Sequence, residues 1–79
     1  MQVYVKLFAS LRRFASDAPL GTPIDVDVPE GATLTELYQT LQLPVDEIKL
    51  AYINGRVQPD DWPLQPGDEI GIFPPVGGG

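Results

Sequence analysis

The chain has 79 residues, which is enough for one small domain with a modest core. It contains neither cysteine nor histidine, so disulfides, thiol nucleophiles, Ser-His-Asp triads and the usual zinc sites are excluded. Eleven acidic residues against five basic ones give a net charge of -6, which argues against binding to nucleic-acid phosphates or anionic membranes and suits a partner with a basic face.

The N-terminal part of the sequence predicts two strands that pair with each other. Residues 2–8 alternate in character, and their odd-numbered apolar side chains are expected to face the core. Residues 9–15 predict a short helical turn, and residues 17–23 are rich in glycine and proline, which is typical of a loop. Residues 24–28 alternate again, so a second strand is expected beside the first.

One substantial helix is predicted over residues 34–42. Thr33 fits the N-cap position and Glu36 follows three residues later, which is the pattern of a capping box. Apolar side chains then recur at helical spacing, at Leu34, Leu37, Tyr38 and Leu41. Pro44 is expected to end the helix, because a proline disfavours helical backbone in the residue before it.

The second half of the chain predicts a hairpin followed by an irregular segment. Residues 50–53 predict a strand, and Asn54-Gly55 is a preferred pair for a two-residue hairpin turn, because both positions need positive φ. Residues 56–58 are expected to form a short returning strand. Residues 59–64 are irregular and contain Trp62, which is expected to lie in a loop against the edge of the core.

A last strand is predicted over residues 69–73. Residues 65–68 fit a type II turn before it, with proline at the second position and glycine at the third. Alternation along the strand turns Ile70 and Ile72 toward the core and Phe73 to the opposite face.

The order of these elements is strand, strand, helix, strand, short strand, strand. It predicts an α+β domain in which one main helix packs across one mixed sheet. We expect this domain to cover residues 1–75 and residues 76–79 to form a flexible glycine tail.

The composition also gives an expectation for cellular location. No segment is apolar over a length that crosses a bilayer, and the N-terminus lacks the features of a signal peptide. A cytoplasmic location is therefore the default expectation.

The acidic excess need not indicate a partner with a basic face. The alternative explanation is solubility, because net charge also keeps a small domain soluble.

The C-terminal stretch combines a stiff segment with a flexible one. Pro74-Pro75 fixes two φ angles and favours an extended stem, and Val76 is followed by three glycines that fit a narrow slot. A carboxylate is a poor electrophile until it is joined to a nucleotide phosphate as an acyl adenylate, so the carboxylate of Gly79 is the candidate reacting group. The sequence contains no phosphate-binding loop, and a partner would therefore have to bind ATP. The alternative is a frayed terminus or a residual linker.

Two acidic pairs, Asp60-Asp61 and Asp68-Glu69, are the other candidates for chemistry. Paired carboxylates can act in acid–base catalysis or bind Mg²⁺. Both pairs lie near turn prolines, and nothing in their surroundings indicates burial or a fixed partner. We therefore expect solvated loop residues at these positions and no metal site.

Arg12, Arg13 and Phe73 are candidates for partner contacts. The arginines lie between apolar neighbours and would either meet a partner's carboxylates or simply occupy an exposed turn. Phe73 would face outward just before the tail, where an exposed aromatic ring is a good docking anchor. The alternative for Phe73 is partial cover by Pro75 or a neighbouring loop.

Three segments of the chain follow a known pattern. They are GDEIGIFPPVGGG at residues 67–79, VYVKLFA at residues 3–9 followed by Leu11-Arg12, and YING at residues 52–55. Together they resemble the MoaD/ThiS family of ubiquitin-like sulfur carriers, and the first is closest to the molybdopterin-synthase branch. The resemblance covers the whole chain in length and element order, and the ending is its specific part.

The resemblance implies a ubiquitin-like β-grasp fold and a sulfur-transfer cycle. A partner similar to ubiquitin-activating enzymes would use ATP to adenylate Gly79, and a persulfide would then convert the adenylate into a thiocarboxylate. The chain would not be an enzyme by itself. It would insert its tail into the large subunit of molybdopterin synthase, in a heterotetramer with the catalytic residues on that partner. There it would donate sulfur for the dithiolene of molybdopterin.

The same family pattern implies which residues meet a partner. It places Gly78 and Gly79 in the partner's slot and an apolar patch that includes Phe73 against the partner's surface. With Arg12 and the stem, the candidate partner-binding residues are Phe73, Pro74, Pro75, Val76, Gly77, Gly78 and Arg12. No bound cofactor and no metal are implied. Gly77 departs from many relatives, which carry a side chain there, and would loosen the tail slightly.

Three alternatives are left open by the sequence. The chain would also fit a sulfur carrier of another pathway, such as the one that makes the thiazole of thiamine. It would equally fit a ubiquitin-like modifier that becomes joined to lysines, since the chemistry is the same up to the adenylate. The last alternative is a β-grasp interaction module whose glycine tail is inert.

Overall fold

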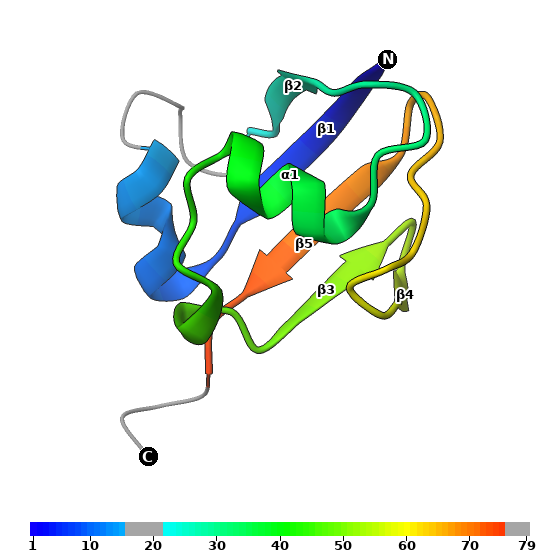
Figure 1. Cartoon of the computed structure of the whole chain (residues 1–79). Coiled ribbons are helices and arrows are strands. Elements are labelled where there is room, and N and C mark those ends of the chain that lie inside the picture. The colour runs from blue at the N-terminus through cyan, green and yellow to red at the C-terminus, as the bar shows by residue number, and fades with distance from the viewer. Residues whose placement is uncertain (16–21, 76–79) are drawn as a thin grey trace.

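A computed structural model of the chain describes residues 1–15 and 22–75. Within these residues it contains a five-stranded sheet and a short α-helix (Figure 1). The strands are β1 (Gln2–Leu7), β2 (Ile24–Asp27), β3 (Leu50–Ile53), β4 (Arg56–Val57) and β5 (Glu69–Phe73). The helix α1 spans Leu34–Thr40, and two 3-10 turns, η1 and η2, span Ala9–Ala15 and Val45–Glu47. Every predicted strand is present, and each boundary lies within one residue of its expected position.

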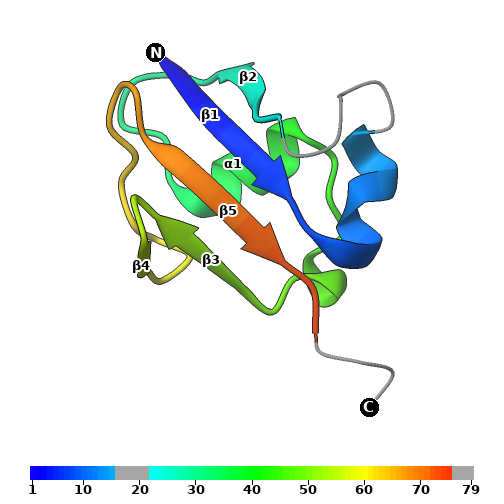
Figure 2. The same ribbon diagram turned by 180° about the vertical axis from the view of Figure 1, so that it is seen from behind.

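The topology of the sheet puts β1 and β5, the first and last of the described strands, side by side. The strand order is β2-β1-β5-β3-β4. β1 and β5 are parallel, and the other neighbouring pairs are antiparallel, including the predicted pair of β1 and β2. α1 crosses one face of the sheet (Figure 1), and the view from behind has β1, β5 and β3 in front of the helix (Figure 2). This arrangement is the ubiquitin-like β-grasp fold, so the predicted fold class is confirmed.

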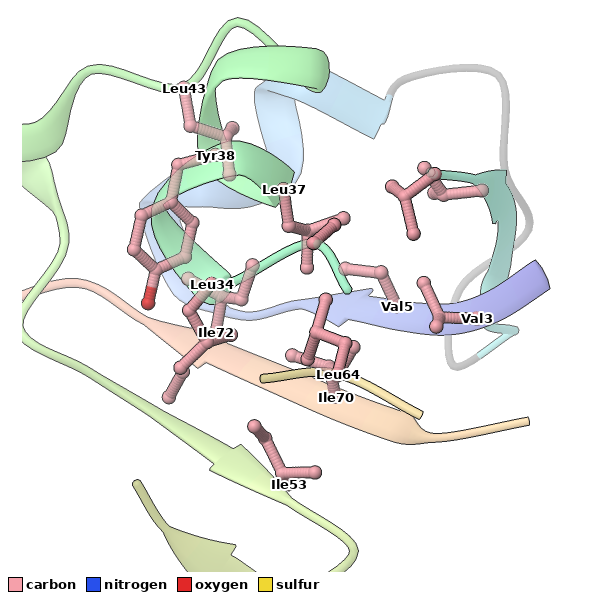
Figure 3. Packing of buried hydrophobic residues seen from close by; sticks show 14 of the residues in the cluster. Val3, Val5, Leu34, Leu37, Tyr38, Leu43, Ile53, Leu64, Ile70 and Ile72 are labelled. Atoms are coloured by element: carbon pink, nitrogen blue, oxygen red, sulfur yellow. The ribbon is translucent and has the colours of Figure 1, made fainter. Parts of the chain in front are cut away.

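The core lies between α1 and the face of the sheet that the helix covers, which we call the inner face. Alternation along β1 and β5 turns their apolar side chains to this face (Figure 3). The buried side chains include Val3, Val5, Leu34, Leu37, Tyr38, Leu64, Ile70 and Ile72. Burial of one aliphatic side chain contributes about 1.5–3 kcal/mol. The core therefore fixes the register of β5, because a slip by one residue would turn its isoleucines to the opposite face.

The start of α1 is fixed by the predicted capping box. The Glu36 amide donates to Thr33 Oγ1 at 3.4 Å, and the Thr33 amide donates to Glu36 Oε1 at 3.2 Å. The Leu34 amide, which has no partner inside the helix, donates to the carbonyl of Trp62 at 3.3 Å. Trp62 lies in a loop, as expected, and its backbone holds that loop against the start of the helix.

The end of α1 differs from the prediction. The helix stops at Thr40, two residues before the expected end, because Gln42 takes a left-handed conformation with a φ of 57°. The Leu43 amide then donates to the Tyr38 carbonyl at 3.0 Å, which is the bond that closes a Schellman motif. The helix therefore ends before Pro44 can act on it.

Two turns have the predicted conformations. Asn54 and Gly55 have φ values of 52° and 89° and join β3 to β4 as a two-residue hairpin. Gly67 has a φ of 82°, and the Asp68 amide donates to the Gln65 carbonyl at 3.1 Å, which fits the type II turn before β5. Local sequence alone was enough to predict both turns.

Some predictions fall on residues that the structure does not describe. Residues 76–79, the expected glycine tail, lie outside the described residues, and so does most of the expected loop at residues 17–23. The boundary between the domain at residues 1–75 and the tail therefore stays a prediction. Within residues 1–15 and 22–75, no helix is long and apolar enough to cross a membrane.

Candidate functional site

The hydrogen bonding of the sheet stops at Phe73. From the β1 side, the Phe8 amide donates to the Ile72 carbonyl at 3.1 Å. From the β3 side, the Lys49 amide donates to the Phe73 carbonyl at 2.8 Å. The next two residues are prolines, which have no backbone N–H to donate. The chain therefore leaves the centre of the sheet at a defined point, which we call the tail exit (Figure 2).

Two short turns lie beside the tail exit. η1 packs against β5, and Arg13 of η1 forms an ion pair with Glu47 of η2. Arg13 also donates to the Ser10 carbonyl at 2.8 Å and lies 4.5 Å from the centre of the Phe14 ring. An exposed ion pair contributes about 0–1 kcal/mol, so its main effect is to join the two turns. Arg12 is half-buried on η1, and its contact with a partner stays a prediction.

Three aromatic side chains gather beside the tail exit on the outer face of the sheet, which is the face opposite α1. The ring of Phe8 stacks on that of Phe73 with centroids 4.2 Å apart and planes 2° apart. Tyr52 meets Phe73 edge-on at 5.5 Å and 76°. Phe73 faces outward, as predicted, and is half-buried because Phe8 and Tyr52 cover it. We call Phe8, Tyr52 and Phe73 the aromatic cluster.

Gly71 makes room for this cluster. A Cβ atom on Gly71 would lie 3.1 Å from Cε2 of Phe8 and 3.6 Å from Cε1 of Phe73. The Phe8 ring therefore rests against bare backbone of β5, and a side chain at Gly71 would displace it. Sequence reasoning did not identify Phe8 or Gly71 as site residues, because they meet only through the parallel register that pairs Lys6 with Gly71.

The outer face changes in character along β5. Next to the aromatic cluster it holds a shallow groove of about 400 Å³, lined in part by Tyr4, Lys6 and Tyr52. Farther from the tail exit, exposed Asp25 and Glu69 are the strand neighbours of Tyr4. The outer face is therefore apolar beside the tail and acidic at its other end. Such a surface suits a partner that is apolar around its tail slot and basic beyond it.

The structure corrects the expectation for one acidic residue. Asp68 was expected to be solvated, but its side chain is only 7% exposed. It accepts hydrogen bonds from Asn54 Nδ2 at 2.9 Å and from the Gln65 amide at 2.8 Å, so it holds two turns together. The other three acids of the two pairs are exposed, as expected. Among the described residues, no group of three His, Cys, Asp or Glu side chains is placed to hold a metal ion.

Tyr38 is the one described residue whose ionisation is clearly perturbed. Burial, and secondly the negative charge of Asp60, raise the pKa of Tyr38 to about 12. Its hydroxyl is buried and has no hydrogen-bond partner among the described residues. Tyr38 lies in the core rather than in the groove, so this perturbation indicates an imperfectly satisfied core position and no catalytic group.

The predicted reacting group lies beyond the described part of the chain. Gly79 and its neighbours Val76, Gly77 and Gly78 are outside it, so their roles stay predictions. The structure does describe the start of the stem, where Pro74 is half-buried and Pro75 is exposed. It therefore defines the surface from which a tail would extend.

The chain matches one protein-family model and several solved structures. The model of the ThiS family matches residues 5–79 of the chain. No curated protein sequence matches the chain. Among solved structures, a Pyrococcus furiosus protein assigned as subunit 1 of molybdopterin converting factor is 27% identical, with a TM-score of 0.75. That alignment covers 95% of this chain and 98% of the other.

Two further solved structures have similar folds, one of a modifier protein and the other of a chain from a molybdopterin-converting factor. Small archaeal modifier protein 1 of Haloferax volcanii is 26% identical over 95% of this chain and 98% of its own, with a TM-score of 0.75. A chain in a Helicobacter pylori complex of subunits 1 and 2 of molybdopterin-converting factor is 23% identical over 100% of both chains, with a TM-score of 0.63. At that identity, the last likeness is one of fold.

Proposed function

Because the chain belongs to the ThiS family, we propose that it is a sulfur carrier whose Gly79 carboxylate is adenylated and then converted to a thiocarboxylate. The observation that carries the proposal is the tail exit, where the central strand of the sheet runs into Pro74 and Pro75. A group at the end of such a stem can enter a partner's slot while the domain stays outside.

The proposed chemistry takes place at one carbon atom. In a partner enzyme, the Gly79 carboxylate attacks the α-phosphate of ATP and pyrophosphate leaves. A persulfide on a sulfur donor then attacks the acyl carbon and AMP leaves. A thiol cleaves the resulting S–S bond, so that the terminal sulfur stays on Gly79 as a thiocarboxylate and the thiols become a disulfide. The chain supplies no catalytic side chain in this scheme, and the use of ATP fits a cytoplasmic protein.

The outer face supports docking of the domain during these steps. The aromatic cluster lies next to the tail exit, and aromatic side chains are frequent energetic centres of protein interfaces. Arg12 on η1 and the acidic end of the outer face would fix the orientation of the partner. The partner's slot would then lie in line with the stem, around Val76, Gly77 and Gly78.

Within this family we favour the molybdopterin branch. The Pyrococcus furiosus relative is assigned to it, and the Helicobacter pylori fold relative was solved as a complex of subunits 1 and 2. By analogy, the large subunit of molybdopterin synthase is the proposed acceptor partner, in a heterotetramer. Two carriers would each give one sulfur to a pyranopterin and return to the carboxylate form, which completes the dithiolene.

Intact mass spectrometry tests the proposed thiocarboxylate. Protein isolated from cells with active sulfur transfer should contain a species heavier by the difference between sulfur and oxygen. A matched variant with one alanine added after Gly79 should fold normally and lack this species, because the carboxylate is displaced from the slot. Persistent absence of the heavier species in the natural chain, or its presence in the extended variant, would contradict the proposal.

A reconstitution tests the branch. The thiocarboxylated chain is mixed with purified large subunit and pyranopterin substrate, and formation of the dithiolene is measured. Product formation that stops when Gly79 is deleted would support the molybdopterin branch. A thiocarboxylate that forms but gives no dithiolene would instead indicate a carrier of another pathway, such as thiamine-thiazole synthesis.

A second candidate function is a ubiquitin-like protein modifier. The likeness to small archaeal modifier protein 1 favours it, since the same adenylate can be attacked by a lysine amine. Proteolysis of cell extract followed by mass spectrometry would then find lysines that carry the C-terminal glycines of this chain. If trimming Gly78-Gly79 changed neither sulfur transfer nor conjugation, the chain would be an interaction module with an inert tail.

A further inference from the structure

Asn54 is the only asparagine of the chain, and it is followed directly by Gly55. Asparagine before glycine is the arrangement most prone to spontaneous deamidation, because glycine leaves its own backbone nitrogen unhindered. The Gly55 nitrogen attacks Cγ of Asn54 and ammonia leaves, which gives a succinimide. Water then opens either C–N bond of the ring and produces aspartate or isoaspartate. No oxidant, reductant or enzyme is needed.

We propose that Asn54 is a modification site whose deamidation breaks the link between the β3–β4 hairpin and the start of β5, and that the native fold itself delays this reaction. The inference is independent of the proposed sulfur chemistry. It concerns the opposite end of β5 from the tail exit, and it depends only on contacts between described residues.

The Asn54 side chain joins two turns through both ends of its carboxamide. Its Nδ2 donates to Oδ1 of the buried Asp68 at 2.9 Å. Its Oδ1 accepts from the Glu69 amide at 3.0 Å, and the Asn54 amide donates to the Glu69 carbonyl at 2.8 Å. Asn54 is therefore the central member of a network that attaches the hairpin turn to the start of β5, next to the antiparallel pairing of β3 with β5.

These bonds explain why the folded state should delay deamidation. To react, the carboxamide must rotate until Cγ meets the Gly55 nitrogen, and this rotation breaks the bonds to Asp68 and Glu69. The backbone of the turn, with positive φ at both Asn54 and Gly55, must also rearrange. Reaction therefore requires local opening of the hairpin, and the fraction of open molecules limits its rate.

The product cannot rebuild the bond to Asp68. An aspartate at position 54 has no Nδ2 donor, so a second carboxylate would face Asp68 at the distance of the former hydrogen bond. Like charges this close repel, and Asp68 is too buried for water to screen them fully. An isoaspartate also adds a methylene group to the backbone, which disturbs the geometry of a two-residue turn. Either product should loosen the hairpin turn from the start of β5, while the antiparallel pairing of β3 with the rest of β5 remains.

The site also lies on the surface that the proposed function uses. Asn54 and Gly55 line the groove on the outer face, together with Tyr52 and Glu69. Deamidation would add a negative charge there and loosen one wall of the groove. Molecules that have opened often would in this way become marked, irreversibly, on the face that a partner meets.

The rate of the reaction is the first test. The full chain is incubated at mildly alkaline pH with and without denaturing urea, and peptides containing position 54 are analysed for deamidation and isoaspartate. The native protein should react at least about tenfold more slowly, since two hydrogen bonds must break. Asn54→Gly is the control that cannot deamidate, because glycine accepts the positive φ of this position but has no carboxamide. Equal rates in both states would overturn the protective role of the fold.

The stability of matched variants is the second test. Asn54→Asp should lower the midpoint of thermal unfolding by about 5–15 °C at neutral pH, and Asn54→Gly should lower it less. The loss of stability in Asn54→Asp should become smaller toward pH 4. Repulsion between the carboxylates at positions 54 and 68 favours protonation of one of them in the folded state, and a protonated carboxyl no longer repels the other. The exchange Asn54→Asp with Asp68→Asn should recover much of the loss. An Asn54→Asp variant as stable as the natural chain, or no recovery in the exchanged variant, would overturn the proposed release.

Discussion

Ile72 and Phe73 are neighbours in β5, yet they serve opposite faces of the sheet. Ile72 is fully buried, with 0% exposed, in the core that α1 closes. Phe73 is half-buried on the outer face, where it packs against Phe8 and Tyr52. Alternation along β5 therefore places one side chain in the core, where it stabilises the fold, and the next on the outer face, where a partner can contact it. A substitution on the inner face should change the free energy of unfolding, and one on the outer face should mainly change docking.

The largest loss of stability is expected for Ile72→Ala. It removes a fully buried side chain next to α1 and leaves a cavity, which should cost about 2–5 kcal/mol in unfolding free energy. Urea denaturation measures this loss, and Ile70→Val serves as a mild control, at about 0.5–1.5 kcal/mol. A cost for Ile72→Ala no larger than that for Phe73→Ala would show that the inner face is not the main source of stability.

Phe73→Ala should separate the two roles most clearly. Phe73 is half-buried, so its truncation should cost about 1–2 kcal/mol, less than Ile72→Ala. Adenylation by a partner should nevertheless fall further in Phe73→Ala, as measured by pyrophosphate release. Val57→Ala is the control, since it removes an exposed apolar side chain that lies outside the aromatic cluster. If Ile72→Ala impaired adenylation more at a temperature where both variants are folded, the division between the faces would be wrong.

Tyr38→Phe tests an exception on the inner face, a polar atom in an apolar core. Removal of its unpaired hydroxyl should raise stability by about 1 kcal/mol. The pKa of Tyr38 is raised to about 12, so folding favours the neutral phenol. Below pH 10 the phenol is neutral in both the folded and the unfolded chain, so its ionisation does not lower stability. As the pH rises from about 10 to about 12, the phenol ionises first in the unfolded chain, and the free energy of unfolding falls. The free energy of unfolding, measured between pH 10 and pH 12, should therefore fall more steeply in the natural chain than in Tyr38→Phe.

Gly71→Ala should have the smallest effect on stability. Its Cβ would press on the far end of the Phe8 ring, and this cost is offset by the lower flexibility of alanine in the unfolded chain, so the net change should stay within about 1 kcal/mol. The NMR shifts of the Phe8 and Phe73 rings should change much more, because the stack is displaced. In a Phe8→Ala background the substitution should cost nothing, and a persistent cost there would exclude Phe8 as the obstacle.

Local sequence predicted the elements because each one is encoded over a few residues. Alternation located β1 and β5, Thr33 and Glu36 located the start of α1, and Asn54-Gly55 located the hairpin. The end of the helix was missed because glutamine carries no preference for the left-handed conformation that Gln42 adopts. Pro44 was the more visible signal, and it lies too late in the chain.

The candidate site was less predictable because its members meet across the sheet. The tail and the outward direction of Phe73 follow from local sequence. The role of Phe8 does not, since it depends on the parallel register between β1 and β5. The burial of Asp68 likewise depends on Asn54, which belongs to another turn. Pairing between distant segments, rather than residue type, decided each of these contacts.

The position of β5 in the sheet also sets the order of events during synthesis. β5 follows the other four described strands in the sequence, yet it separates the β2-β1 pair from the β3-β4 pair. On the ribosome, the earlier strands therefore emerge as two half-sheets that share no edge and cannot close a common core. Contacts this distant in sequence form late and slowly. Because β5 is translated after these four strands, it completes the sheet and carries the stem outward, so a chain arrested before β5 would have neither a closed core nor the stem for a partner to engage.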